Sequence, residues 1–474
     1  MRWNMMGVVF ALAWAVAATQ VADAGCHKRM ADYPIDYGVK PWLPESVQRT
    51  ADEALISTYA NTQLAQYGHD ILINRPDYIL FVPTQPMADK DVDITRPGDT
   101  YNDHVHVIYD ERRDRLFAFW TQATWESGHD QHIAFSQSYD RGRHWTSPQV
   151  LAGSSSLRNP TPIASWQQPM ISRSGRIYVL WNQQTTSRET SHGEIFGTWT
   201  DTCGSRWEQP RHLRFPQRSD LDADDPFESP QWCNWQRPLR LGTGGRYFVG
   251  SSRTGKAPYD AKKKGKTEFW QYENIDEDPP VDKIRISVFN TNRDAFEVDE
   301  AKSGFNPDDP ENSCIQEPSI VKLPDGRLFS IMRSSFGHPV WSQSRDGGRT
   351  WDRWKILKDK SGKPFLHPRS PCPMYDWKGC EAGSGTYFAL IHNTFDFKSR
   401  TAFQNRGPLY LIAGTFDPEG EQPVAFAEPK LFAPRRSGNS FYTSYTVIGG
   451  KGVLWFNDDK FYILGREIGH EWFK

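Results

Sequence analysis

The sequence lacks the features by which membrane-spanning, nucleic-acid-binding and metal-binding proteins are usually recognised. Its longest apolar run, Val8–Ala18, is shorter than the ~20 residues that a bilayer-spanning helix needs. A net charge of −2 leaves no basic footprint for a nucleic acid. The 474 residues include only six cysteines, and no C-x-x-C pair or histidine cluster has metal-ligand spacing. We therefore expect no membrane span, no nucleic-acid partner, no metal and no cofactor.

The apolar run near the start is instead typical of a signal peptide. Arg2 precedes the run, and Ala22–Ala24 has the A-x-A form of a cleavage site. We expect residues 1–24 to be removed, and the mature protein to be a secreted or periplasmic monomer. Disulfides can form in that compartment. Cys372 and Cys380 are spaced to close a short loop, and the other pairings stay open.

Turn-forming and aromatic residues are abundant, with 36 glycines, 33 prolines and 19 tryptophans. This composition favours a large all-β protein with many turns. Residues 25–76 are expected to form an N-terminal extension, in which Pro44–Tyr67 has the apolar spacing of a helix. Residues 77–474 are expected to form the β domain. A polar segment near 255–310 shows little strand pattern and predicts an insertion.

One stretch, Gln316–Trp351, reads as three successive antiparallel strands that end in a tight turn. The turn has the form Ser-x-Asp-x-Gly-x-x-Trp over Ser344–Trp351, and the same form recurs at Ser138–Trp145. Thr200–Trp207 is a degenerate copy. In this motif we expect the Asp to accept backbone hydrogen bonds, the Gly to take a positive φ and the Trp to fold over the turn. Such a repeat indicates a repeated architecture.

Six modules of about the size of a four-stranded propeller blade follow one another along the chain. The last has room for only three strands, and Asp77–Pro83 would supply the fourth. We predict a six-bladed β-propeller of four-stranded antiparallel blades, closed by this N-terminal strand; a β-sandwich is the alternative. The second strands of the modules are Arg115–Trp120, Arg176–Trp181, Arg246–Val249, Arg327–Met332, Tyr387–Ile391 and Gly452–Phe456. A Gln-x-Pro signature precedes three of them, at Gln167–Pro169, Gln236–Pro238 and Gln316–Pro318.

Taken together, the turn motifs and modules resemble the sialidase (neuraminidase) superfamily over roughly residues 103–467. The motifs mark the fold in that family, and its activity resides in residues that face the central axis. The resemblance implies a glycosidase that releases a terminal acidic sugar, most simply sialic acid, with retention. Arginines would bind the sugar carboxylate, and a tyrosine activated by a glutamate would attack in place of an anionic nucleophile.

The resemblance extends to individual positions. Tyr442 matches the nucleophile and Glu317 its partner base. Asp130 lies in the loop where the acid that protonates the leaving group belongs. Arg333 and Arg406 match two of the arginines that bind the carboxylate.

The family's first arginine is missing, because counting back from the first blade places it on His104. A histidine can carry a positive charge and donate one hydrogen bond, but it cannot make the two-pronged contact of a guanidinium. Arg369, expected to begin a strand of the fifth blade, is a further candidate for lining the pocket. The departure at His104 leaves the choice of acidic sugar open.

Two other functions suit the same residues. A polysaccharide lyase acting on uronate-containing glycans would use His104 or His129 with Tyr442 to move a proton, and Arg333 to neutralise the carboxylate. A propeller that binds glycans without turnover is the third hypothesis. The neighbouring Tyr445 offers an alternative register for Tyr442.

Overall fold

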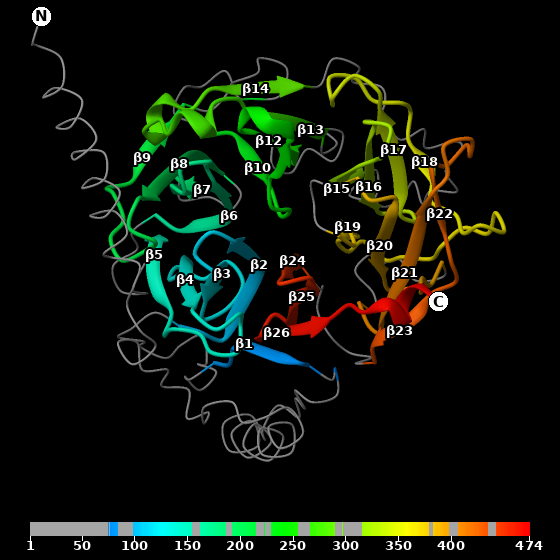
Figure 1. The fold of residues 1–474 in the computed structure, drawn as a ribbon, viewed down its shortest axis with the longest axis horizontal. Helices are drawn as coiled ribbons and strands as arrows, with labels where there is room; N and C mark the ends of the chain where they lie inside the picture. The colour runs from blue at the N-terminus through cyan, green and yellow to red at the C-terminus, as the bar shows by residue number, and fades with distance from the viewer. Residues whose placement is uncertain are drawn as a thin grey trace, which may run out of the picture.

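The computed structural model is a six-bladed β-propeller, as predicted, in which six antiparallel sheets surround a central axis (Figure 1). It describes residues 74, 76–83, 98–153, 162–185, 192–214, 222, 229–254, 266–289, 296, 315–378, 383–397, 406–434 and 442–474. The expected signal peptide and the expected helix over Pro44–Tyr67 lie outside these residues. No helix in the described part of the chain is long and apolar enough to cross a membrane.

The blades follow the chain in order. Blade I contains β2 (Tyr101–Asp110), β3 (Arg115–Ala123), β4 (His132–Ser138) and β5 (Gln149–Gly153). Blade II contains β6 (Ala164–Ile171), β7 (Ile177–Gln184), β8 (Gly193–Thr200) and β9 (Arg211–Leu213). Blade III contains β10 (Gln231–Cys233), β11 (Leu239–Leu241), β12 (Arg246–Thr254), β13 (Lys266–Tyr272) and β14 (Ile286–Phe289).

The second half of the chain forms the other three blades. Blade IV contains β15 (Ile315–Lys322), β16 (Leu328–Ser334), β17 (Val340–Ser344) and β18 (Lys355–Ile356). Blade V contains β19 (Met374–Asp376), β20 (Thr386–Ile391), β21 (Leu409–Phe416), β22 (Val424–Phe426) and β23 (Lys430–Ala433). Blade VI contains β24 (Thr443–Ile448), β25 (Lys451–Asp458), β26 (Tyr462–Glu467) and β1 (Tyr78–Phe81). Short 3₁₀ turns occur at η4 (Gly242–Gly244), η5 (Ile275–Glu277), η6 (Val281–Lys283) and η9 (His470–Phe473).

An N-terminal strand closes the ring, as predicted. β1 pairs antiparallel with β26, with Tyr78 opposite Gly465, and in Figure 1 the blue strand lies beside the red one. Blade VI is also joined to blade I near the axis. The Val107 N–H donates to Ser444 Oγ at 3.0 Å, and Thr446 Oγ1 donates to Val107 O at 2.9 Å.

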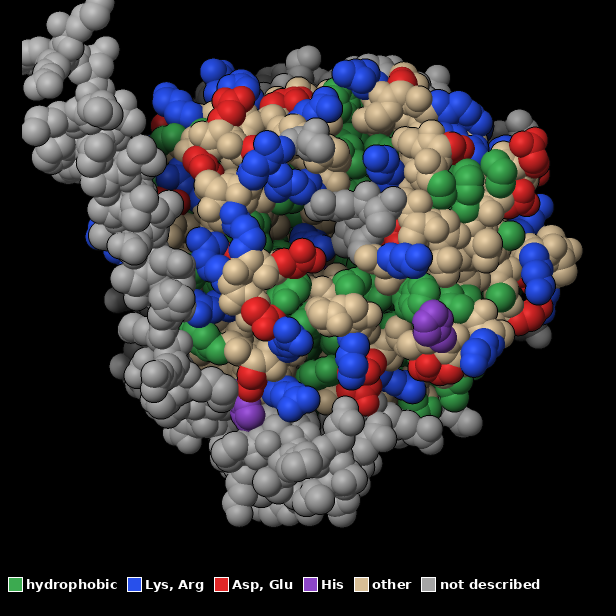
Figure 2. Space-filling model, viewed as in Figure 1, with side chains coloured by type: hydrophobic (Ala, Val, Ile, Leu, Met, Phe, Trp, Pro, Cys, Tyr) green, Lys and Arg blue, Asp and Glu red, His purple; other side chains and the backbone are tan. Residues whose placement is uncertain are grey.

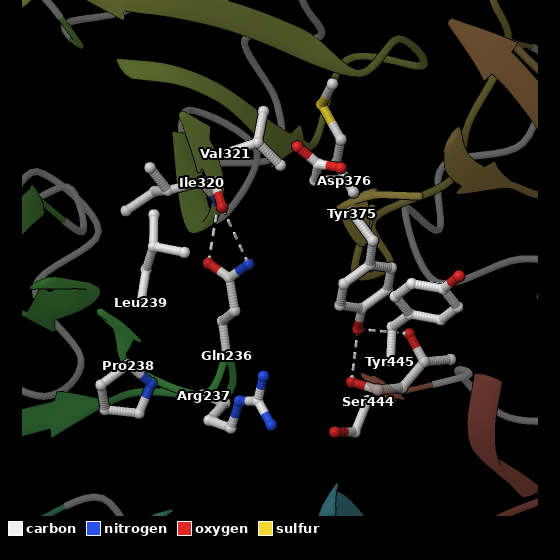
Figure 3. A pocket seen from close by; sticks show the side chains of 12 residues that line it. Gln236, Arg237, Pro238, Leu239, Ile320, Val321, Tyr375, Asp376, Ser444 and Tyr445 are labelled. Atoms are coloured by element: carbon white, nitrogen blue, oxygen red, sulfur yellow. Dashed lines mark hydrogen bonds between the residues drawn. The ribbon is translucent and has the colours of Figure 1, made fainter. Parts of the chain in front are cut away.

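Side-chain hydrogen bonds between first strands hold neighbouring blades together at the axis (Figure 3). Gln236 of blade III accepts from the Ile320 N–H of blade IV at 2.8 Å. Tyr375 of blade V donates to Thr443 O of blade VI at 2.6 Å. The glutamine of a Gln-x-Pro signature therefore has a structural role here, because it satisfies backbone groups of the next blade.

The expectation of an insertion near 255–310 is wrong for residues 266–272, which supply β13 of blade III. Strand β14 of the same blade falls within Lys283–Phe289, the one part of the segment whose sequence has a strand pattern. Phe269 and Trp270 are adjacent in β13, and both are fully buried. Strand β13 thus buries side chains on both faces and shows no alternating pattern that would reveal it. The residues of the segment outside 266–289, apart from Phe296, lie outside the described part of the chain.

The possible loop disulfide between Cys372 and Cys380 is also absent. Cys372 carries a free, buried thiol, which rules out a bond to Cys380. Cys233 is free as well. Cys203 is disulfide-bonded.

The Ser-x-Asp-x-Gly-x-x-Trp turns have the expected internal contacts. In Ser138–Trp145 the Gly142 N–H donates to Ser138 Oγ at 2.8 Å, and the His144 N–H donates to Asp140 Oδ1 at 2.8 Å. Trp145 Nε1 donates to Gly142 O at 3.0 Å. In Ser344–Trp351 the same three contacts measure 2.8, 2.9 and 3.0 Å.

These turns also attach each blade to the one before it. Gly348, with φ +92°, lies so close to Phe248 of blade III that an added Cβ would be 2.2 Å from its ring. Trp351 stacks on Phe269 of the same blade at 4.2 Å between ring centroids. The glycine is therefore required both by its backbone conformation and by the packing between blades.

We predict that Gly348→Ala lowers the free energy of unfolding by about 2–5 kcal/mol, because a positive φ and an overpacked ring contact are strained together. Gly326→Ala is the matched control. Gly326 has φ +89° and nothing within 4 Å of an added Cβ, so only the backbone cost of about 1–2 kcal/mol applies. Urea unfolding of both variants measures the difference, and equal losses would contradict the packing role.

Candidate active site

The first strands of blades I, II and IV are each interrupted by a bulge at the same end of the propeller. His104 in β2, Trp166 in β6 and Glu317 in β15 have φ values of 54°, 53° and 53°, and each strand shifts register there. A bulge changes the direction of a side chain relative to the alternating pattern of its strand. The three bulged residues border a single cluster at this end of the axis, as the contacts below show.

The centre of the cluster is a hydrogen bond between Tyr442 and Glu317. Tyr442 Oη donates to Glu317 Oε1 at 2.9 Å, and Arg333 Nη1 lies 3.0 Å from the same oxygen. Arg333 Nη2 also donates to Gln316 Oε1 at 2.8 Å. Tyr442 lies immediately before β24, whereas the Tyr445 hydroxyl donates to Trp377 O at 2.7 Å. The register of β24 thus directs Tyr442, and not Tyr445, into the cluster.

Arg406 belongs to the same cluster. Its Nη2 donates to Arg369 O at 2.7 Å. Burial lowers the pKa of Arg406, the charge of Arg333 lowers it further, and Tyr442 and Glu317 oppose both effects. Two guanidinium groups are therefore close enough to act on each other beside Tyr442. Arg369 lies in the loop before β19 and not in a strand as expected.

The phenol of Tyr442 is held in its neutral form. Burial, followed by the negative charge of Glu317, raises its pKa well above the usual range, and Arg333 and Arg406 act in the opposite direction. Glu317 is in hydrogen-bonding position to take the phenolic proton during an attack. This arrangement suits a nucleophile that loses its proton only as it reacts.

His104 is neutral, and its tautomer follows from its partner. Trp166 Nε1 donates to His104 Nε2 at 3.2 Å, and an indole nitrogen can only donate. His104 Nε2 is therefore an acceptor, and the proton lies on Nδ1. Burial lowers the pKa of His104. Its ring packs against Tyr442 at 4.3 Å between centroids, so His104 supports that ring and brings no positive charge.

A buried lysine supplies the positive charge next to His104. Lys460 Nζ lies 3.1 Å from Asp103 Oδ2 and 2.8 Å from Glu126 Oε1. Asn457 Nδ2 donates to the other Asp103 oxygen at 2.7 Å. The sequence analysis missed Lys460, which lies in the turn between β25 and β26. Only the contact between blades VI and I brings it to the site.

Asp130 is placed differently from the residues of the cluster. It is fully buried, and its Oδ2 accepts from the Gly98 N–H at 2.8 Å, the Thr124 N–H at 3.0 Å and the Thr124 hydroxyl at 2.6 Å. These contacts fasten the loop between β3 and β4. Among the described residues, no group of three His, Cys, Asp or Glu side chains could hold a metal ion.

A buried histidine pair lies beneath the arginines. His367 Nε2 lies 3.1 Å from Ser370 O, and His367 Nδ1 accepts from the His392 N–H at 3.1 Å. Only the neutral tautomer with its proton on Nε2 satisfies both contacts. Burial lowers the pKa of His367 to about 4, which agrees with this geometry.

We predict that His367 makes folding weaker in acid. The folded pKa is about 4 and the ordinary value is 6.5, so between these values the unfolded chain binds the extra proton. The contribution of His367 is complete above pH 6.5 and is lost as pH falls toward 4, by at most about 3 kcal/mol. In urea unfolding across this window, His367→Gln should have a flatter stability profile than the wild type, and parallel profiles would contradict this role.

The comparisons with known proteins agree with this fold. The family described as "BNR repeat-like domain" matches residues 113–447. The NanB sialidase from Streptococcus pneumoniae has a similar structure, with a TM-score of 0.54, 12% identity, and 81% of this chain and 71% of that chain covered. The leech intramolecular trans-sialidase has a TM-score of 0.54 and 9% identity, with 78% of this chain and 68% of that chain covered. The Trypanosoma rangeli sialidase has a TM-score of 0.51 and 11% identity, with 84% of this chain and 58% of that chain covered.

No curated protein matches the sequence. At these identities, the likeness to solved structures shows the fold alone.

Proposed function

The chain belongs to the BNR repeat-like domain family, and from this premise we propose that it is a sialidase-like glycosidase. Its substrate would be a terminal acidic sugar, sialic acid or a related one, on a glycan. One observation carries the proposal: Tyr442 donates to Glu317 at 2.9 Å, next to the guanidinium groups of Arg333 and Arg406. This constellation provides a nucleophile, its base and a binding site for a carboxylate.

The proposed reaction has two steps and retains the anomeric configuration. Arg333 and Arg406 bind the carboxylate of the sugar. Tyr442 Oη attacks the anomeric carbon while Glu317 takes the phenolic proton, and the bond to the leaving oxygen breaks as that oxygen receives a proton from an acid. Water then attacks the glycosyl–tyrosine intermediate and gives its proton to the conjugate base of that acid, while the bond to Tyr442 breaks and Glu317 returns its proton to the phenolate. A neutral tyrosine suits this step, because the substrate carboxylate would repel an anionic nucleophile.

The proposed acid lies in the loop between β3 and β4. Asp130, the residue expected from the sequence, is fully buried and accepts three hydrogen bonds, two from Thr124 in that loop and one from the Gly98 N–H before β2. Glu126 in the same loop is 61% exposed and contacts Lys460 beside His104. We propose that Glu126, once it leaves the contact with Lys460 and takes up a proton from solvent, protonates the leaving group, and that Asp130 holds the loop in place.

The lyase alternative needs a base with an available lone pair. On His104, Nε2 already accepts from Trp166, and Nδ1 carries the proton. His104 therefore cannot remove a proton from a sugar in this arrangement. The geometry at His104 therefore favours hydrolysis over elimination, and His129, the other candidate base, is exposed in the loop between β3 and β4. Both reactions would use Arg333 to bind a carboxylate.

We further propose that the protein is exported and acts as a monomer in a secreted or periplasmic setting. The expected signal peptide lies outside the described residues. The disulfide at Cys203 supports an oxidising compartment.

We predict that Tyr442→Phe lowers kcat for release of a fluorogenic aryl group from its α-sialoside by at least about a hundredfold. The fold should be kept, because only a hydroxyl is removed. Tyr445→Phe is the matched control three residues further on, in β24, since its hydroxyl contacts Trp377 O away from the cluster. Full activity in Tyr442→Phe would rule out the proposed nucleophile.

A second assay distinguishes the three functions. Uronate-containing polysaccharides are incubated with the wild-type protein, and the product is followed by near-ultraviolet absorbance and by reducing ends. Elimination creates an absorbing unsaturated product, whereas hydrolysis creates reducing ends only. Glycan binding with no turnover of either substrate would favour a non-catalytic propeller.

A further inference from the structure

A cavity of about 610 Å³ lies at the end of the first strands that is away from the candidate active site. The strand β2 runs from His104 at the candidate active site to Asp110 at this cavity, and β6 runs from Trp166 to Ile171. The turns after both strands, the segment around β11, the start of β12, the residues after β19 and β24 also line the cavity. The cavity therefore lies on the opposite face of the propeller. Its volume is in the range of ~300–1,000 Å³ that is usual for small-molecule sites.

Positive charge dominates the lining. Five cationic side chains contribute to it, and two acidic ones, so the difference is +3 in a chain whose net charge is −2. Figure 2 shows Lys and Arg side chains gathered beside a hollow near the centre of the face in view. The cationic residues are Arg112, Arg173, Arg237, Arg240 and Lys378, and the acidic ones are Asp110 and Glu111.

Carboxylates and carbonyl oxygens of the protein hold several of these guanidinium groups in place. Arg112 Nε lies 3.4 Å from Asp110 Oδ1, and its Nη1 donates to Arg173 O. Arg240 donates to Asp276 Oδ2 at 2.6 Å and to Ile171 O at 2.8 Å. Arg112 and Arg173 nevertheless keep 48% and 67% of their side-chain surface exposed. Positioned cations with accessible surface are suited to bind an anion without a large ordering cost.

Aromatic rings distinguish this cavity from a site for a simple ion. Tyr109 and Tyr247 line it beside the cations. The Tyr109 hydroxyl donates to Asp114 Oδ1 at 2.6 Å, and the Tyr247 hydroxyl donates to Ile171 O at 2.6 Å. Tyr247 is buried beneath the Arg240 guanidinium, which lies 5.4 Å from its ring centroid, so it supports that cation. Tyr109 is half-buried and can offer its ring to a ligand, because aromatic rings pack against the apolar faces of sugars.

We propose that this cavity is a second binding site, specific for an anionic oligosaccharide whose carboxylate or sulfate groups contact Arg112, Arg173 and Lys378. The site is separate from the one at Tyr442 and does not depend on the proposed reaction. A purely structural role for these cations, as ties between the turns of neighbouring blades, would give no such binding.

The test is isothermal titration calorimetry of the whole protein with a uronate disaccharide. A sulfated disaccharide distinguishes sulfate from carboxylate as the preferred group. A neutral disaccharide and inorganic sulfate complete the ligand set. All titrations are repeated in Arg333→Ala/Arg406→Ala, which removes the carboxylate contacts of the candidate active site and leaves the cavity unchanged.

The charge-reversal variant Arg173→Glu/Lys378→Glu should weaken binding of the preferred acidic disaccharide at least about tenfold, also when Arg333 and Arg406 are replaced. Binding should weaken at higher ionic strength. The matched control is Arg285→Glu/Arg345→Glu, which makes the same charge change at two exposed arginines that do not line the cavity.

Four results would overturn the proposal. The first is that neither acidic disaccharide binds, and the second is that the cavity variant binds the preferred disaccharide as tightly as the wild type does. The third is that the matched control loses as much affinity as the cavity variant. The fourth is that inorganic sulfate or the neutral disaccharide binds as tightly as the acidic disaccharide. Loss of all binding on replacing Arg333 and Arg406 would assign the ligand to the candidate active site alone. None of these results depends on catalytic turnover, so failure of the second site and failure of the proposed reaction are distinguishable.

Discussion

The junction between blades VI and I is the constraint on which the rest of the structure depends. The chain enters the ring through β1 and leaves it through β26, and the pairing of these two strands closes the propeller. Tyr442 lies at the start of β24 in the same blade, so its distance from Glu317 in blade IV is set by a closed circle. The Val107 N–H donates to Ser444 and Val107 O accepts from Thr446, and these hydrogen bonds hold β24 against β2. The candidate active site is therefore a consequence of closure and not of one local motif.

The fold was predictable because its signals are local. Gly348 and Trp351 have fixed offsets within one turn, and the closing strand follows from a module with a missing strand. Blade III was misread where Phe269 and Trp270 bury both faces of β13 and remove the alternation. In the candidate site, Glu317 could be found from its surrounding sequence. Its positive φ and the contact of Lys460 with Asp103 could not, because they arise from a bulge and from packing between distant blades.

The charges at the candidate site favour an incoming anion. Burial lowers the pKa of Arg406, so the folded protein holds its positive charge against a desolvation cost. Arg333, 3.0 Å from Glu317, adds a second guanidinium group to the same cluster. The same argument explains why a neutral histidine can stand at position 104. A further cation at position 104 would raise the desolvation cost of the buried positive charge, whereas the neutral ring supports Tyr442. The charge of Lys460 beside it is balanced by Asp103 and Glu126.

The two ends of the first strands position side chains in different ways: buried at bulges at one end, and exposed on turns at the other. At one end, bulges in β2, β6 and β15 place His104, Trp166 and Glu317 around a buried hydrogen-bonded cluster. A substitution there leaves a buried hydrogen-bonding or charged group without its partner. At the other end, regular strands run into turns, and Arg112 crosses from blade I to the backbone of blade II. Cations on such turns are anchored by backbone oxygens and remain accessible. Side chains at that end can therefore change without altering the geometry around Tyr442.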